Sequence, residues 1–154
     1  MKKLFLIGIF LIFAFSCGGD AGNGGVQNAT PTEALKTFLK AKIEKDAETQ
    51  KKVISRSSLA FLEETAKKQN TTVDRLLTDP AGMELKEVPE MRGEVISGDA
   101  ATVELQNPNT GTWEKMPLVK EDGQWKIALD QAFREVMKKV NDLMKQMPSK
   151  PGEK

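Results

Sequence analysis

The chain has 154 residues, and its 23 Lys and Arg nearly balance its 22 Asp and Glu. This balance argues against a nucleic-acid-binding protein, because that function needs a clustered basic surface. The single cysteine and the absence of histidine and tyrosine exclude an intrachain disulfide, a zinc site with histidine ligands and a nucleophile activated by histidine.

The N-terminus, residues 1–16, has the layout of a bacterial secretion signal. Lys2 and Lys3 precede an apolar run whose length falls in the usual range for a signal, about 7–15 residues. A membrane span needs about 20 apolar residues, so this run is too short to be one. The run ends in Ser16 and Cys17, and this stretch resembles a bacterial lipobox, in which the thiol is acylated and the chain is cut just before it. Phe15 is bulkier than most lipoboxes carry there, so a relaxed lipobox and ordinary signal cleavage nearby are the alternatives. We predict lipidation at Cys17 and a lipid anchor in a membrane of the bacterial envelope, facing the periplasm or the cell surface.

The next segment, residues 17–29, is predicted to be a tether. Gly18–Ala29 contains five glycines in twelve residues and offers no apolar face to bury, so we expect it to be flexible, with a reach of about 20 Å. One domain is predicted over residues 30–147, which is long enough for a hydrophobic core, and a disordered tail over residues 148–154.

Helical signals fill the first part of the domain. Thr30-Pro31-Thr32-Glu33 is a capping box for a helix over about Pro31–Lys45. Its apolar stripe is Leu35, Phe38, Leu39 and Ile43.

Three shorter helical stretches are predicted after it. Asp46 caps a helix that carries Ala47, Val53 and Ile54, followed by a break near Ser55–Ser58, where hydroxyl groups compete for backbone hydrogen bonds. Ser57 or Ser58 then caps a helix through about Gln69. Its predicted buried residues are Leu59, Phe61, Leu62 and Ala66. Thr71–Asp74 opens a short helix with Leu76 and Leu77 inside, which ends at Asp79-Pro80.

Beyond Ala81 the apolar residues alternate, which predicts strands. Met83–Val88 is a candidate edge strand limited by Pro89. Met91–Ser97 and Ala101–Gln106 form a predicted hairpin around Gly98–Ala100. A three-residue loop pairs Val95 with Val103 and Gly93 with Leu105 and keeps one face apolar, whereas a two-residue loop sets Val95 opposite Thr102. The alternation therefore favours the three-residue loop.

A second hairpin is predicted for Thr112–Glu121 and Gln124–Leu129, joined by Asp122-Gly123, the strongest hairpin signal in the chain. The expected pairs are Leu118 with Ile127, Met116 with Leu129, and Lys120 with Trp125. Pro117 lies inside the first of these strands, so that strand is expected to be bulged or at an edge there.

The last predicted helix is Gln131–Met147, capped by Asp130. Its apolar face comprises Phe133, Val136, Met137, Val140, Leu143, Met144 and Met147. Its other faces carry the basic residues Arg134, Lys138, Lys139 and Lys145. The helix is predicted to bury the apolar face within the molecule, on the sheet, or in a dimer; contact with a membrane or another protein is the alternative.

Helices followed by an antiparallel meander predict an α+β fold. The pattern of Pro31, Leu35 and Phe38-Leu39, then Asp46, ATVEL at 101–105 and PLVKEDGQWKI at 117–127, resembles the nuclear-transport-factor-2-like (cystatin-like) domains of small bacterial lipoproteins of unknown function. The similarity covers about Thr30–Leu129. It implies a curved sheet wrapped around the N-terminal helices as a cone that is often hollow. The longer helices and the extra C-terminal helix depart from that family.

No catalytic, metal-binding or cofactor-binding residue is predicted. Enzymes of this superfamily generally use Asp, Tyr and His in the cone, and this chain has neither of the last two. The acids next to apolar strand positions, Glu94, Glu104 and Glu114, are assigned to a solvated face. Glu84, Glu87 and Glu90 lack the spacing of a calcium loop. Trp113 and Trp125 are candidates for the floor of a ligand cavity, although the core is the more frequent place for such residues.

Three functions remain after these exclusions. The favoured one is a non-enzymatic, membrane-anchored module that binds a small apolar ligand or a protein. The first alternative is a structural protein that dimerises through the last helix. An isomerase- or dehydratase-type enzyme is the less favoured alternative. The expected partners are therefore the lipid bilayer, through the acylated Cys17, then a small apolar ligand or a protein, and a second copy of this chain. Any cavity is expected to be small, aliphatic and free of convergent charged groups.

Overall fold

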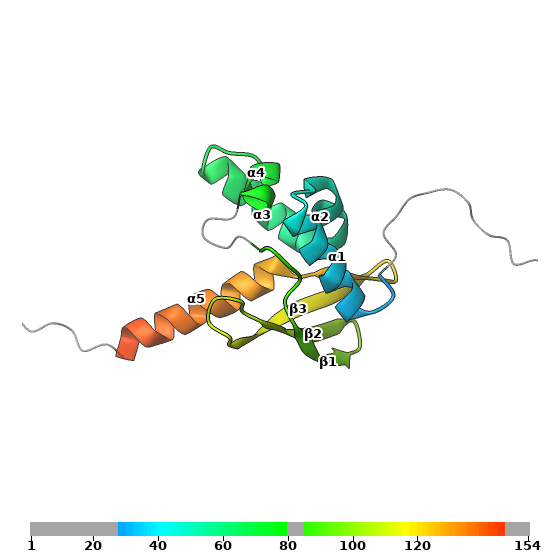
Figure 1. Cartoon of the computed structure of the whole chain (residues 1–154). Coiled ribbons are helices and arrows are strands. Elements are labelled where there is room, and N and C mark those ends of the chain that lie inside the picture. Colours follow the sequence, from blue (N-terminus) through cyan, green and yellow to red (C-terminus); the bar gives the residue numbers. More distant parts are fainter. Residues whose placement is uncertain (1–27, 80–84, 147–154) are drawn as a thin grey trace, which may run out of the picture.

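The computed structural model describes residues 28–79 and 85–146 and has the predicted α+β class. The helices in these residues are α1 (Pro31–Ile43), α2 (Ala47–Val53), α3 (Arg56–Lys68), α4 (Val73–Thr78) and α5 (Leu129–Gln146), and the strands are β1 (Met91–Ser97), β2 (Ala100–Gln106), β3 (Trp113–Glu121) and β4 (Gln124–Ile127). The strands form one antiparallel sheet in the order β1-β2-β3-β4. Helix α1 lies across the sheet, α2 to α4 gather at one side of it, and α5 leads away from it (Figure 1).

The predicted helix starts are confirmed for α1, α2 and α4. In the capping box of α1, the Thr30 hydroxyl accepts from the Glu33 amide at 3.2 Å, and the Glu33 carboxylate accepts from the Thr30 amide at 3.1 Å. Asp46 and Thr72 accept from the amides three residues further on. The cap of α3 is Ser55, which accepts from the Ser58 amide at 3.1 Å, so the prediction of Ser57 or Ser58 was wrong.

The fold includes a residue that precedes the predicted boundary at Thr30. The side chain of Asn28 is buried, its carbonyl accepts from the Trp125 amide at 3.4 Å, and its side-chain oxygen accepts from the Thr37 hydroxyl at 3.2 Å. Asn28 therefore joins the fold, although the glycine-rich composition placed it in the tether.

The second hairpin has the predicted turn and most of the predicted pairs. Leu118 pairs with Ile127 and Lys120 with Trp125, while Asp122 and Gly123 have φ values of +51° and +78°, as a two-residue turn of this kind requires. The predicted pair of Met116 with Leu129 was wrong, because β4 ends at Ile127 and Leu129 begins α5.

Pro117 occupies an edge position within β3. It faces Thr102 of β2 in an unbroken register, and its carbonyl accepts from the Ala128 amide at 3.0 Å on the other side. In a strand, the backbone nitrogen and oxygen of one residue point to the same side, which for Pro117 is the side of β4. At this position β4 has already ended, so no strand carbonyl lacks a donor because Pro117 has no N–H. The edge alternative is confirmed.

The first hairpin differs from the prediction. Its turn has two residues, Gly98 and Asp99, and Val95 pairs with Thr102. A β-bulge between Arg92 and Val95, with Gly93 at φ +62°, inserts one extra residue and shifts the alternation. The candidate strand Met83–Val88 was also wrong in its described part, since residues 85–88 form no strand; residues 83 and 84 lie outside the described residues.

The core lies between α1, the end of α2 and one face of the sheet. Its buried members include Leu35, Phe38, Leu39, Val53, Ile54, Val103, Leu118, Trp125 and Ile127. Ile54 bridges to Ile127 in parallel, and the Ser55 amide donates to the Ile127 carbonyl at 2.9 Å. The α2–α3 junction thus covers the β4 edge of the sheet, which would otherwise present unpaired backbone groups.

Helix α5 packs against α3 near its start, and much of its apolar face is exposed. It begins at Leu129, so Asp130 lies in its first turn rather than at its cap. Phe133 stacks against Phe61 of α3 at a centroid distance of 5.2 Å. Leu143 and Met144 are each 62% exposed, and the far part of the helix extends past the sheet (Figure 1). The prediction that the apolar face is buried within the molecule was therefore wrong for the described residues, and burial in a dimer remains a prediction; Met147 lies outside the described residues.

Candidate functional site

An apolar cavity of about 250 Å³ lies between the helices and the sheet. Its walls come from α1, α3, α4, the segment before β1, the β2–β3 hairpin and the start of α5. The lining residues are Phe38, Leu39, Lys42, Leu62, Leu76, Leu77, Leu85, Pro89, Leu105, Asn107, Pro108, Glu114, Met116 and Leu129. Most of them are aliphatic or aromatic, as the sequence led us to expect, and the volume is near the lower limit of about 300 Å³ for small-molecule sites.

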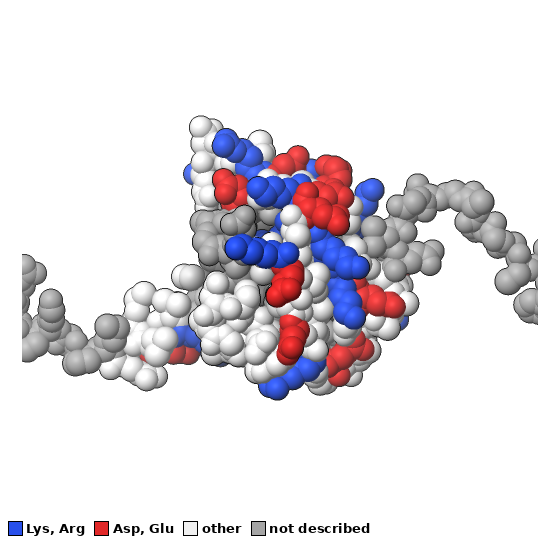
Figure 2. Space-filling view, in the orientation of Figure 1, with Lys and Arg blue, Asp and Glu red and all other residues white. Residues whose placement is uncertain are grey.

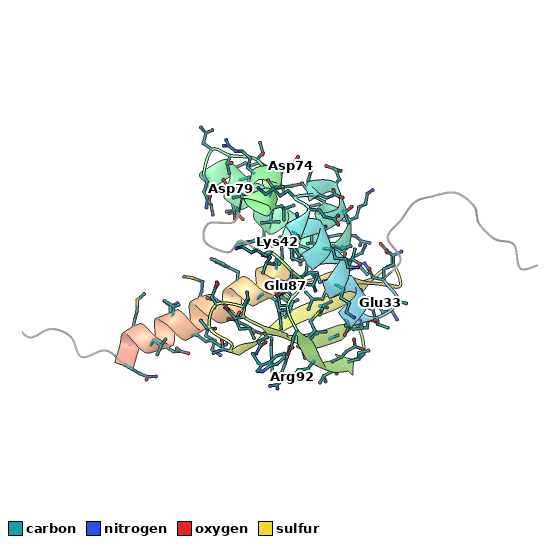
Figure 3. The ribbon with its side chains drawn as sticks, in the orientation of Figure 1. Glu33, Lys42, Asp74, Asp79, Glu87 and Arg92 are labelled. Carbon is teal, nitrogen blue, oxygen red and sulfur yellow. The ribbon has the colours of Figure 1, made fainter. Side chains whose placement is uncertain are left out.

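One ammonium group, that of Lys42, lines this cavity. Lys42 follows Phe38 and Leu39 by four and three residues, so the helical repeat of α1 sets it on the apolar stripe. The residue is half-buried, and Figure 3 labels Lys42 on α1. Burial lowers the pKa of Lys42, because a desolvated ammonium is less stable than a hydrated one.

Another wall of the cavity carries a carboxylate. Glu114 of β3 is exposed, as predicted, and accepts a hydrogen bond from the Asn107 side-chain amide at 2.8 Å. Glu114 and Lys42 form no ion pair with each other. The cavity therefore has a positive group on α1 and a negative group at the β2–β3 hairpin.

A second hollow, about 290 Å³ in volume, runs between α5 and the sheet. It is lined by Leu105, Glu114, Lys115, Met116, Ala132, Glu135, Val136, Lys139, Val140 and Leu143. Leu105, Glu114 and Met116 also line the first cavity, so these three side chains border both hollows. An apolar surface thus continues from the helical cluster to the underside of α5.

Glu94 and Glu104 have structural partners rather than a place in the cavity. Glu94 accepts from the Thr32 amide at 2.9 Å and from its hydroxyl, tying β1 to the first turn of α1. Glu104 pairs with the Arg92 guanidinium at 2.9 Å. Neither carboxylate lines the cavity or the groove under α5.

The two described acids before β1 lie at one hollow of the surface. Glu87 and Glu90 line a further hollow with Val88, Pro89, Gln106 and Pro108. Within residues 28–79 and 85–146, no group of three or more His, Cys, Asp or Glu side chains is arranged to hold a metal ion. Glu84 lies outside these ranges.

Neither tryptophan forms the floor of the cavity. Trp125 is buried in the core, and Trp113 is half-buried beneath the Arg92 guanidinium, whose carbon lies 3.8 Å from the ring centroid. The more frequent role in the core is thus confirmed for Trp125, and Trp113 forms a cation–π contact beside the Arg92–Glu104 pair.

The buried carboxylate of Asp130 connects α3 with α5. From the sequence this residue was expected only to cap the last helix. Asp130 accepts from the Ser58 hydroxyl at 2.8 Å, from the Ser57 hydroxyl at 3.2 Å and from the Arg134 guanidinium at 2.5 Å. Burial raises the pKa of Asp130, but the hydrogen bonds and the Arg134 charge outweigh it and hold the pKa below its ordinary value. Asp130 is therefore a stable anion with a structural role, and it lines none of the three hollows.

The predicted lipidation site Cys17 lies outside the described residues. Among the helices that the structure describes, none has the length and apolar character needed to cross a membrane. Comparison with known protein families, with curated proteins and with solved structures finds no significant match for this chain.

Proposed function

We propose that the chain is a lipid-anchored protein of the bacterial envelope whose domain binds a small apolar ligand. The observation that carries this proposal is the cavity of about 250 Å³, because its lining is mostly apolar and carries few polar groups. A cavity with this composition is typical of sites that hold an apolar molecule and orient it by a small number of polar contacts.

The charged groups at the cavity favour binding over catalysis. General acid–base chemistry near neutral pH needs a group that titrates there, within hydrogen-bond reach of the reacting atom. The chain contains no histidine, the carboxylate at the wall is solvent-exposed, and the buried Asp130 is held as an anion by its serine and arginine partners. We therefore propose a non-enzymatic role.

Ligand binding is tested with the mature chain, residues 17–154, carrying Cys17→Ser so that it has no acyl chain of its own. Native mass spectrometry reports both a co-purified ligand and the oligomeric state. Titration with the uncharged fluorescent probe N-phenylnaphthylamine then measures binding to the cavity. Leu77→Arg brings a charge to a buried cavity wall and is expected to remove probe binding, while the exposed substitution Lys40→Met is its control. No co-purified ligand together with no probe binding refutes the proposal.

The anchor is supported by the order of signal, Ser16, Cys17 and glycine-rich segment. Acyl chains contribute about 0.8 kcal/mol per buried methylene, so two or three chains hold a protein firmly on a membrane. Cys17→Ala is expected to abolish labelling with a tagged fatty acid and to release the protein from membranes, whereas Ser16→Ala keeps a small residue before the cysteine and retains both. Full labelling of the Cys17→Ala protein would show that the anchor is elsewhere.

A structural protein that dimerises through α5 is the second candidate function. The observation in its favour is the exposed apolar face of α5, where Phe133, Val136, Met137, Leu143 and Met144 are all exposed. Figure 2 shows largely uncharged surface over the far part of the helix on the side that faces the viewer. Sedimentation of the mature chain and of a Leu143→Ser, Met144→Ser double variant tests it, because a dimer held by this face dissociates in the variant.

A further inference from the structure

Lys42 occupies a position that nothing in the fold of the described residues requires to be charged. It stands on the stripe of α1 that otherwise carries Leu35, Phe38 and Leu39, and its half-buried side chain lines the cavity. Its ammonium forms no ion pair with a carboxylate of residues 28–79 or 85–146.

An unpaired ammonium at such a place costs free energy. Removing a charge from water is unfavourable, and the cost is offset only when an opposite charge or several acceptors replace the water. The lowered pKa of Lys42 has this same physical cause. A ligand that brings an anionic group to the ammonium would supply the missing partner in surroundings where water screens the attraction less than in bulk solvent.

The remaining walls favour an apolar body attached to that anion. Leu62, Leu76, Leu77 and Leu85 surround the space beside Lys42, and the shared side chains Leu105 and Met116 lead into the groove under α5. Glu114 lines the cavity from β3 and repels an anion, so the two charges of the cavity favour one orientation of a ligand that has an anionic end.

We propose that the cavity binds a single-chain amphiphile whose carboxylate or phosphate head group pairs with Lys42 and whose alkyl chain lies along the leucine-rich wall toward Leu105 and Met116. This inference rests on the proposed ligand-binding function and adds the chemical class of the ligand and the residue that selects it.

The test compares ligands that share one alkyl chain and differ in the head group. Decanoate, decyl phosphate, decanol and decyltrimethylammonium are each titrated as competitors of N-phenylnaphthylamine on the Cys17→Ser mature chain, all below their micelle-forming concentrations. The two anions are expected to bind about tenfold to a hundredfold more tightly than decanol, because a hydrogen bond to a charged group contributes about 1.5–3 kcal/mol. The cation is expected to bind least well, and inorganic phosphate alone is expected not to displace the probe.

Substitution of Lys42 assigns the effect to this residue. Lys42→Met keeps an unbranched apolar side chain and is expected to equalise decanoate and decanol while leaving the affinity for decanol unchanged. Lys42→Arg retains the preference for anions. Lys40→Met, on the solvent side of the same helix, removes an equal charge and keeps the preference. Thermal unfolding checks that each variant is folded.

The outcomes separate this inference from the function on which it rests. If no alkyl compound displaces the probe and the probe itself does not bind, the ligand-binding function is wrong. If decanol binds as tightly as decanoate, if the cation binds best, or if Lys42→Met keeps the preference for anions, the inference is wrong and the apolar site remains. If decanoate binds more tightly than decyl phosphate, the natural ligand is indicated to be a fatty acid. If decyl phosphate binds more tightly, the ligand is indicated to derive from a phospholipid.

Discussion

The buried carboxylate of Asp130 should be one of the strongest polar contributions to the stability of this domain. It joins the first turn of α5 to the first turn of α3 through Ser58 at 2.8 Å and Ser57 at 3.2 Å. The bond to Arg134 has an exposed donor and contributes less than about 1 kcal/mol. Hydrogen bonds to a buried charge contribute about 1.5–3 kcal/mol each and are not additive. Asp130→Ala is therefore expected to lower the free energy of unfolding by about 2–4 kcal/mol, mostly through the Ser58 bond.

The dependence of this contribution on pH has a defined sign. The pKa of Asp130 is lower in the folded protein than in the unfolded chain, where an aspartate titrates near about 3.9. The stabilisation is thus fully present above the unfolded pKa and is lost as the pH falls through the folded one. Asp130→Asn resembles the protonated acid, so its deficit relative to the natural chain is expected to be largest at neutral pH and to shrink in acid.

Urea unfolding of the natural chain and the variants, at neutral pH and in acid, provides the measurement. Thermal unfolding at neutral pH should show a decrease of about 10 °C for Asp130→Ala, since 1 kcal/mol corresponds to about 4 °C in a domain of this size. Asp142→Asn changes an exposed carboxylate on the same helix and serves as the control. If Asp130→Asn and Asp142→Asn have the same unfolding free energy at every pH, the buried network does not stabilise the fold and the argument is refuted.

Three further stability predictions follow from packing and backbone geometry, each measured by urea unfolding. Gly93→Ala is expected to cost about 1–2 kcal/mol, because φ is +62° and an added Cβ would lie 3.2 Å from a Glu104 oxygen; an unchanged value would mean that the bulge can move. Gln50→Met is expected to be neutral or stabilising by about 1 kcal/mol. The substitution removes a long hydrogen bond of 3.3 Å to the Ala41 carbonyl, but it also removes a buried side-chain oxygen that has no partner among the described residues; a clear loss would reveal a partner. Leu143→Ser should change stability by less than about 0.5 kcal/mol, whereas Leu118→Ala in the core should cost about 2–5 kcal/mol; equal losses would place α5 in the core.

The helix starts were predictable because their hydrogen bonds are local. The Thr30 and Asp46 caps each bond to an amide three residues further along the chain, so four consecutive residues contain the whole interaction. The turn at Asp122-Gly123 has the same property, because both residues adopt positive φ without help from distant parts of the fold. For α3 the local signal was divided among three serines, any of which could cap the helix. Ser55 is the cap in the structure, and its amide also donates to the carbonyl of Ile127, a residue far along the chain.

The register of the first hairpin was not predictable from alternation. The prediction assumed that β1 has one buried face, so that Val95 must lie opposite an apolar residue. Val95 and Ile96 are instead 61% and 52% exposed, so burial does not fix the register of this strand. The left-handed backbone at Gly93 permits the bulge and the two-residue turn.

The candidate site was predictable only in its composition. An aliphatic cavity with few polar groups follows from the shortage of aromatic residues and the absence of histidine and tyrosine in the chain. Its charged groups come from elements far apart in the sequence, with Lys42 on α1 and Glu114 on β3. A signal for Lys42 was nonetheless present, because it continues the spacing of Leu35, Phe38 and Leu39 on one helical stripe. A lysine in that register is a candidate for partial burial and not only for solvent.

Helix α5 connects the two candidate functions. Its 18 residues correspond to a length of about 27 Å. Phe133 packs against Phe61 of α3 near its start, and residues from Ala132 to Leu143 line the groove toward the sheet. The apolar stripe continues through Leu143, which is exposed. Since Leu143 also lines the groove that shares Leu105 and Met116 with the Lys42 cavity, any partner that covers this face also covers one end of the proposed ligand site. Dimerisation and amphiphile binding therefore should not be independent, and the affinity for decanoate is expected to depend on protein concentration if α5 pairs with a second copy.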